Sequence, residues 1–365
     1  MIVAIERRLI RNLDFFFLSL AILLFILGIV NLRSAGGGSG VWKHQLIWFG
    51  ISILAMAVML AIDYHRFQGL APAFYLLCLG LLVLVLLVGP EIHHSRSWLL
   101  FKGFRIQPSE LAKLAVVLML ARFYQRREEP GPMGVRDIIY PLAVILIPAG
   151  LTALEPDLGT TLIFLLFGAG LLLFIGIRWK LLVLLTILGL LSAPVGWKYV
   201  LKPHQKTRIL TFIYPSQDPL GAGYNLQQSK TAIGSGGVFG KGWGKGSQNR
   251  LRYLPEQHTD FAFSIWAEEW GFLFGAIPAL LLYLLVLIRG IMIASESKDR
   301  FGIMLALGTV MVIFSHFMVN LLMISGWFPV IGVPLPFFSY GGSHLVVLFM
   351  MLGLILNVGM RRYVF

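Results

Sequence analysis

Acidic and basic side chains beside long apolar runs give this sequence its candidate chemistry. Glu110 and Lys113 lie near the start of one run, and their i,i+3 spacing places both on one face of a helix. Glu155 and Asp157 occupy a short turn between two runs, and Asp260 just precedes another run. A carboxylate in such a place can act as a general base, and a nearby cation can stabilise a departing anion.

The same residues also have structural interpretations. Glu110 suits the first turn of a helix, where the helix dipole favours an acid, and Lys113 could extend beside it toward the headgroups. Asp157 could cap the helix that follows it. Thr259 could cap the next helix, with Asp260 as an acid in its first turn. The residues alone therefore leave chemistry and capping open at all three places.

The elements that must position these side chains are membrane helices. Of the 365 residues, 58% are hydrophobic and 13% are charged, whereas soluble domains have ~25% charged residues. A soluble core cannot bury so much apolar surface, and ~20 apolar residues suffice for one membrane helix. We therefore expect an all-α polytopic membrane protein, a single domain over 1–365, with ten transmembrane helices at 15–32, 45–62, 70–88, 108–124, 138–154, 158–177, 181–199, 262–288, 303–325 and 344–360.

Basic residues predict the orientation of these helices, because cytoplasmic loops carry an excess of lysine and arginine. The two ends of the chain and the loops on their side hold most of the basic residues outside one long loop. The short loops of the opposite side hold only Arg33, Lys43, Arg96, Lys102 and Arg105. We therefore expect both termini in the cytoplasm and one long extracellular loop, at 200–261, between helices 7 and 8.

The expected loop at 200–261 is rich in glycine, basic residues and aromatic residues. Its basic residues outnumber its acids, and aromatic side chains such as Tyr224 and Trp243 are spread through it. This composition is not that of a disordered segment, so the loop is expected to be ordered. Its positive charge predicts an anionic partner at the membrane surface. Attraction to anionic lipid headgroups would also explain the charge.

A second outer segment, at 334–343, combines prolines, glycines and serines. Irregular backbone is tolerated at membrane depth only where it is buried in protein or lines a cavity. Most such turns are structural, but a small hydroxyl such as that of Ser339 could contact a headgroup. The residues together predict a polar cavity on the outer side, with a basic rim and carboxylates. A protein with such a cavity would either transport an amphiphilic anion or catalyse its reaction.

Several motifs, in order along nearly the whole chain, resemble those of the SEDS family (shape, elongation, division and sporulation proteins). They lie at 96–98, 107–113, 155–160, 218–224, 228–237, 240–242, 254–261 and 337–343. Within the family, the short segments before the first helix and after the last one are more similar to RodA than to its division paralogue FtsW.

The resemblance implies a peptidoglycan glycosyltransferase of the bacterial cytoplasmic membrane. Such an enzyme polymerises lipid II into β-1,4 glycan strands on the outer face, for cell elongation and shape. The implied partners are a class B penicillin-binding protein, lipid II and the polyprenyl-pyrophosphate-linked glycan, the membrane and other elongation-complex proteins. No nucleic acid is expected to bind. The alternatives are a lipid II flippase and a non-catalytic scaffold for the penicillin-binding protein.

The resemblance also implies roles for individual residues. Asp260 matches the catalytic aspartate, which accepts the proton of the attacking sugar hydroxyl. Glu155, Asp157 and Asp260 are candidate oxygen ligands of a divalent cation, Mg²⁺ or Mn²⁺, and no organic cofactor is expected. Because Cys78 is the only cysteine, cysteine-based zinc sites are excluded. The implied substrate-binding residues are Lys113, Glu110, Asp157, Arg208, Trp98, Gln107, Ser109, Gln228, Ser229, Lys230 and Ser339.

Overall fold

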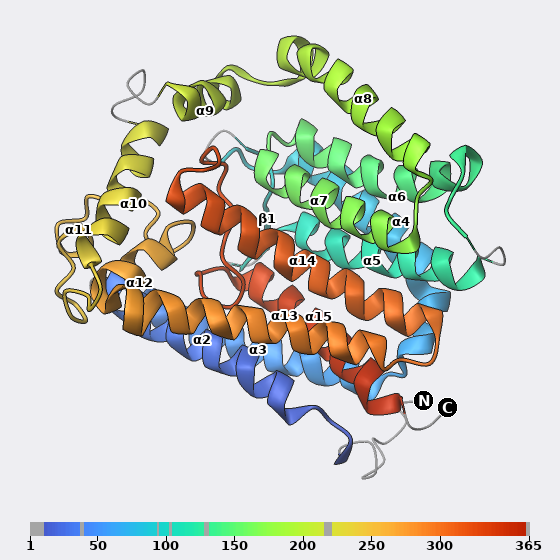
Figure 1. Ribbon diagram of the computed structural model, residues 1–365, viewed down its shortest axis with the longest axis horizontal. Helices are drawn as coiled ribbons and strands as arrows, with labels where there is room; N and C mark the ends of the chain where they lie inside the picture. Colours follow the sequence, from blue (N-terminus) through green and yellow to red (C-terminus); the bar gives the residue numbers. More distant parts are fainter. Residues whose placement is uncertain are drawn as a thin grey trace.

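The computed structural model describes residues 11–36, 40–92, 95–101, 104–127, 131–214 and 221–362. Helices dominate these residues, and their labels follow Figure 1. The elements are α2 (Phe15–Ala35), α3 (Val41–Ala61), α4 (Tyr64–Val88), β1 (Leu99–Phe101), β2 (Phe104–Ile106), α5 (Pro108–Arg126), α6 (Val135–Leu154), α7 (Leu158–Ile175), α8 (Trp179–Val195), η1 (Gly196–Val200), α9 (Pro203–Ile213), α10 (Ala222–Gly236), α11 (Ser247–Arg250), α12 (Ala262–Gly271), η3 (Phe272–Ala276), α13 (Ile277–Ser295), α14 (Arg300–Ser325) and α15 (Gly342–Arg361).

Nine helical segments of the described chain are long and apolar enough to cross a membrane. One of them is continuous from α12 through the π-helical η3 to α13. The apolar run at 108–124 forms a further helix, α5, which is less apolar because it carries Glu110, Lys113 and two arginines. The expectation of a mostly helical, multi-pass membrane protein is thus confirmed.

The helices differ strongly in how far they are buried. Most residues of α14 and α15 are buried, and so is nearly every residue of α5 from Pro108 to Ala121. These three helices therefore form the centre of the bundle (Figure 1). In contrast, α8 exposes almost all of its apolar side chains, as a lipid-facing helix would.

The segment expected to be an ordered loop at 200–261 contains the helices α9, α10 and α11. The helix α10 packs against α12 and α14, and Ser229 Oγ on α10 donates a hydrogen bond to the Ile324 carbonyl, 2.8 Å away. The loop is therefore folded onto the helical bundle. Its motif at 218–220 lies outside the described residues.

Two ends of the bundle can be distinguished by their contacts. At one end, residues 11–16 at the start of α2 and Gly359 and Arg362 at the end of α15 line a common pocket. At the other end, the Arg96 amide donates to the Glu155 carbonyl. The Tyr340 amide donates to the His258 carbonyl at 2.8 Å. This second end brings together the turns that carry the predicted site residues.

Candidate active site

Asp260 is held in place through its backbone. The side-chain nitrogen of Asn320, on α14, donates to the Asp260 carbonyl at 2.8 Å and to the Val333 carbonyl at 2.7 Å. Asn320 is fully buried, so these two bonds replace the water that its amide would otherwise need. The carboxyl group of Asp260 is half-buried and precedes α12.

The interpretation of Thr259 and Asp260 as helix-capping residues is wrong. The helix α12 begins at Ala262, and no side chain caps it. A tight turn precedes it instead, in which the amides of Thr259 and Phe261 both donate to the Glu256 carbonyl. The Thr259 hydroxyl donates to the Glu256 carboxylate at 3.0 Å. The Asp260 carboxyl is therefore not used by the helix.

The turn between α14 and α15 approaches Asp260 closely. Gly332 has a φ of +76°, and a Cβ atom there would lie 3.2 Å from Oδ2 of Asp260. A Cβ atom at Gly159, in the first turn of α7, would lie 2.9 Å from the Ile331 carbonyl oxygen. The start of α7 and the Asp260 carboxyl thus flank one turn, at 331–333, which brings Asp157 into the same region.

The surroundings of Asp260 favour its neutral form. Burial raises the pKa of Asp260 to about 7, and the negative charge of Glu256 acts in the same direction. The Arg208 guanidinium on α9 opposes this shift, while Asp157 adds to it. A carboxyl group with a pKa near neutrality is well matched to general-base catalysis at neutral pH.

The turn between α6 and α7 contains one capping acid and one buried acid. Asp157 caps α7, as its position predicted, because its Oδ1 accepts from the Thr160 amide at 2.9 Å. Its Oδ2 accepts from Gln107 Nε2 at 3.1 Å. Burial raises the pKa of Asp157, and burial together with the Asp157 charge raises the pKa of Glu155 to about 8. Glu155 is therefore largely protonated at neutral pH.

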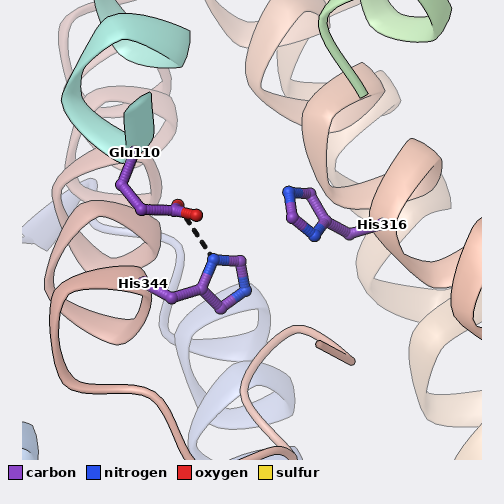
Figure 2. A group of neighbouring side chains, drawn as sticks. All are labelled: Glu110, His316 and His344. Carbon is purple, nitrogen blue, oxygen red and sulfur yellow. Dashed lines mark hydrogen bonds and ion pairs between the residues drawn. The ribbon is translucent and has the colours of Figure 1, made fainter. Parts of the chain in front are cut away.

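The pair of Glu110 and Lys113 is part of a larger buried cluster. Lys113 Nζ lies 2.8 Å from the Glu110 carboxylate and 2.7 Å from Nε2 of His316. His344 Nδ1 lies 2.9 Å from Glu110 Oε2 (Figure 2). The sequence interpretation missed both histidines. Each is an ionisable residue in or at the start of an apolar run, and this was the signal that identified Glu110 and Lys113.

Three serines predicted to contact substrate are buried. Ser229 Oγ bonds to Ser264 Oγ and to the Ile324 carbonyl, and Ser339 Oγ accepts from the Leu335 amide. Ser109 is fully buried with no hydrogen-bond partner for its hydroxyl among the described residues. Substrate contacts by these serines stay predictions.

The other predicted substrate-binding residues are more accessible. Trp98, Arg208 and Gln228 are partly exposed and Lys230 is exposed. Within the described residues, no ion pair engages Arg208. Gln107 bonds to Asp157. Of these residues, Gln107 contacts Asp157, and the charge of Arg208 lowers the pKa of Asp260.

The sequence and the fold match one family of membrane proteins. The family model described as "cell cycle protein", which covers FtsW, RodA and SpoVE, matches residues 8–364. Because the match spans nearly the whole chain, the chain belongs to this family.

Individual relatives are similar over most of their length. The peptidoglycan glycosyltransferase MrdB of Escherichia coli is 39% identical over 94% of this chain and 92% of its own length. Stage V sporulation protein E of Bacillus subtilis is 36% identical over 94% of this chain and 96% of its own length.

Two solved structures share the fold. A chain of a peptidoglycan synthase complex that coordinates polymerization and crosslinking is 35% identical and superposes with a TM-score of 0.84, covering 96% of this chain and 98% of that one. The rod shape determining protein RodA of Thermus thermophilus is 32% identical, with a TM-score of 0.73 and the same coverage. These similarities place the chain on the RodA side of its family.

Proposed function

We propose that this protein is an inverting peptidoglycan glycosyltransferase that polymerises lipid II on the outer face of the bacterial cytoplasmic membrane. The observation that carries the proposal is the Asp260 carboxyl, which is half-buried, has a pKa raised to about 7 and is subject to the positive charge of Arg208. Similarity to MrdB, itself a peptidoglycan glycosyltransferase, supports the same reaction.

In the proposed reaction, ionised Asp260 accepts the proton of the 4-hydroxyl of lipid II. The hydroxyl oxygen then forms a bond to the anomeric carbon of the growing strand, whose bond to the polyprenyl pyrophosphate breaks. Attack opposite the leaving group inverts that carbon and gives a β-1,4 link. The pyrophosphate leaves with the electron pair, and Arg208 stabilises its increasing negative charge.

The other proposed site residues fall into two groups. The first group consists of residues that are not fully buried and that we propose to contact the bound lipid: Arg208, Gln107, Trp98, Gln228 and Lys230. The remaining residues act from within the protein. Lys113, only 1% exposed, lowers the pKa of Asp157 through its positive charge, and Glu110 holds it. Ser109, Ser229 and Ser339 would need local rearrangement to touch substrate.

A divalent cation would suit a pyrophosphate leaving group, but the described side chains do not form a complete magnesium site. Glu155, Asp157 and Asp260 do not converge on one point; the one convergent group of metal-ligating side chains in the described residues is Glu110, His316 and His344. Mg²⁺ is commonly held by one or two carboxylates together with substrate phosphates. We therefore propose that Mg²⁺ or Mn²⁺ binds only with the substrate's pyrophosphate, and that Asp260 or Asp157 supplies a protein ligand.

The proposed topology and partner follow from the same observations. We propose one domain with ten membrane helices, α5 included, both termini in the cytoplasm and the segment 200–261 outside. The shared pocket at residues 11–16 and at Gly359 and Arg362 supports the placement of both ends on one side. Similarity to a chain of a peptidoglycan synthase complex supports a class B penicillin-binding protein as partner, with other elongation-complex proteins around it.

The decisive experiment is polymerisation of labelled lipid II by the purified protein, with and without a class B penicillin-binding protein and Mg²⁺. Wild-type protein should make glycan strands, and Asp260→Asn should make none while keeping its melting temperature and its partner. Full polymerisation by a folded Asp260→Asn protein would refute the assignment. Headgroup translocation by Asp260→Asn in liposomes would favour a lipid II flippase. Polymerisation that requires only the class B penicillin-binding protein would favour a non-catalytic scaffold.

A further inference from the structure

Four ionisable side chains meet inside the bundle, away from the outer carboxyl of Asp260. Glu110 and Lys113 come from α5, His316 from α14 and His344 from the start of α15. All four are buried. Burying so many ionisable groups is costly unless they form hydrogen bonds and ion pairs with one another. Their mutual geometry therefore indicates how they are stabilised in the interior.

The geometry of the cluster is that of a cation site. The ligand atoms of Glu110, His316 and His344 lie within 4.8 Å of one another, and the two imidazole rings are 4.7 Å apart. Figure 2 shows the carboxylate and both rings turned toward a common space. Two imidazoles and one carboxylate are also the ligands of many transition-metal sites.

The ammonium group of Lys113 already occupies this position. Its Nζ lies 2.8 Å from Glu110 and 2.7 Å from His316 Nε2. An ammonium group only donates, so Nε2 of His316 must be the unprotonated acceptor. A carboxylate only accepts, so His344 donates to Glu110 through Nδ1. Each histidine thus holds one member of the ion pair.

We propose that Glu110, His316 and His344 form a cage whose cation is the Lys113 ammonium, and that both histidines are positioning residues for glycosyl transfer. The role in glycosyl transfer rests on the proposed function, whereas the cage itself does not. His316 fixes the ammonium and His344 fixes the carboxylate. The fixed positive charge in turn acts on Asp157, which flanks the same outer turn as Asp260.

The observations favour an ammonium over a metal ion as the occupant. A divalent ion among the three ligands would lie beside the Lys113 ammonium and be repelled by it. The pair of Glu110 and Lys113 is also electrically neutral as it stands, which suits a low-dielectric interior. Metal binding therefore requires removal of the lysine side chain, which gives a direct test.

The cage is tested with Co²⁺, whose visible absorption reports coordination by imidazole and carboxylate. We expect purified Lys113→Ala to bind Co²⁺ with a new visible spectrum, and wild-type protein to show none at the same concentration. The double variant Lys113→Ala/His344→Leu should lose the spectrum. Absence of Co²⁺ binding by folded Lys113→Ala, or binding by wild type that His316→Leu abolishes, would overturn the ammonium cage.

The positioning role is tested by kinetics, which also covers the case in which Lys113→Ala does not fold. We expect His316→Leu to lower kcat for lipid II polymerisation by about tenfold or more, because misplaced groups are costly, with little change in KM. His316→Gln keeps an acceptor for Lys113 and should restore most of the rate. The control Thr309→Val, on the same helix, should match wild type, because that hydroxyl bonds only to its own helix.

The outcomes separate this inference from the proposed function. Equal loss in His316→Leu and His316→Gln, or loss through KM alone, would refute the positioning role. If wild-type protein does not polymerise lipid II at all, the proposed function fails, whereas the Co²⁺ result still decides whether the cage exists.

Discussion

A single side-chain nitrogen of Asn320 donates to the carbonyl of Asp260, at 2.8 Å, and to that of Val333, at 2.7 Å. These two bonds tie the segment before α12 to the turn between α14 and α15. The backbone that carries the Asp260 carboxyl is therefore held by a fully buried residue near the end of α14.

Asn320→Leu should lose both bonds while keeping a side chain of similar size. We expect kcat for polymerisation to fall by about one to two orders of magnitude, because Asp260 is no longer held in place. The buried Val333 carbonyl and the half-buried Asp260 carbonyl lose their partner, so stability should fall by about 1–3 kcal/mol for the first and by less for the second. Lipid II polymerisation and thermal unfolding in detergent measure the two effects. A stability loss with unchanged kcat would show that Asn320 is only structural.

The rate of polymerisation should depend on the protonation of Asp260. The pKa of Asp260 is raised to about 7, so the base is mostly protonated below that pH and ionised above it. The rate should therefore rise with pH through about 7 and then level off. Initial rates across the neutral range measure this profile.

Two substitutions move the midpoint of that pH profile in opposite directions. Arg208 lowers the pKa of Asp260 and Glu256 raises it. Arg208→Gln should therefore shift the midpoint to higher pH, and Glu256→Gln should shift it to lower pH. Shifts in the same direction would exclude Asp260 as the titrating base.

Gly332→Ala should interfere with Asp260 directly. The added Cβ would lie 3.2 Å from the Asp260 carboxylate, and the φ of +76° adds backbone strain of about 1–2 kcal/mol. Gly40→Ala is a matched control, since Gly40 has a φ of +72° and no atom within 4 Å of an added Cβ. Both variants should lose similar stability, but only Gly332→Ala should lose polymerisation. Equal activities would mean that Gly332 serves the turn and not the carboxyl.

The buried pair of Glu110 and Lys113 should be more important for activity than for stability. Lys113→Ala leaves the buried Glu110 carboxylate without its cation and should cost about 3–5 kcal/mol. The double variant Glu110→Gln/Lys113→Met removes both charges and should recover much of the melting temperature without recovering polymerisation. Recovery of both would show that the pair has only a structural role.

Chelation tests the proposal that a metal ion arrives with the substrate. EDTA should abolish polymerisation and excess Mg²⁺ or Mn²⁺ should restore it. Equilibrium dialysis without lipid II should detect no tightly bound Mg²⁺, because Glu155, Asp157 and Asp260 do not converge. Tight Mg²⁺ binding by the substrate-free protein would contradict the proposal.

The features that the sequence predicted well are local ones. The Glu110–Lys113 pair follows from i,i+3 spacing, and the cap at Asp157 follows from its place before a helix. The mostly helical, multi-pass architecture also follows from composition, because apolar runs of membrane length have few other folds. His316 and His344 are ionisable residues in or beside apolar runs, as Lys113 is. Nothing in the local sequence indicated that the two histidines lie beside Lys113 and Glu110.

The features that the sequence could not predict depend on contacts between distant parts of the chain. Asn320 lies sixty residues from Asp260, and no spacing rule connects the two. The capping role of Thr259 was wrong because the local motif competes with the turn at Glu256. This case is local, because a turn in which the Thr259 and Phe261 amides donate to the Glu256 carbonyl decided the conformation there, and not the capping preference of the residues.

The residues that position Asp260 come late in the chain, and this has a consequence for biosynthesis. Asn320, Gly332 and Tyr340 all follow Asp260, and His344 opens the final helix. A nascent chain that has inserted its helices up to α13 therefore carries the carboxyl without the groups that orient it. We expect the polymerase to be inactive during its own synthesis and to gain activity only when α14 and α15 are in place.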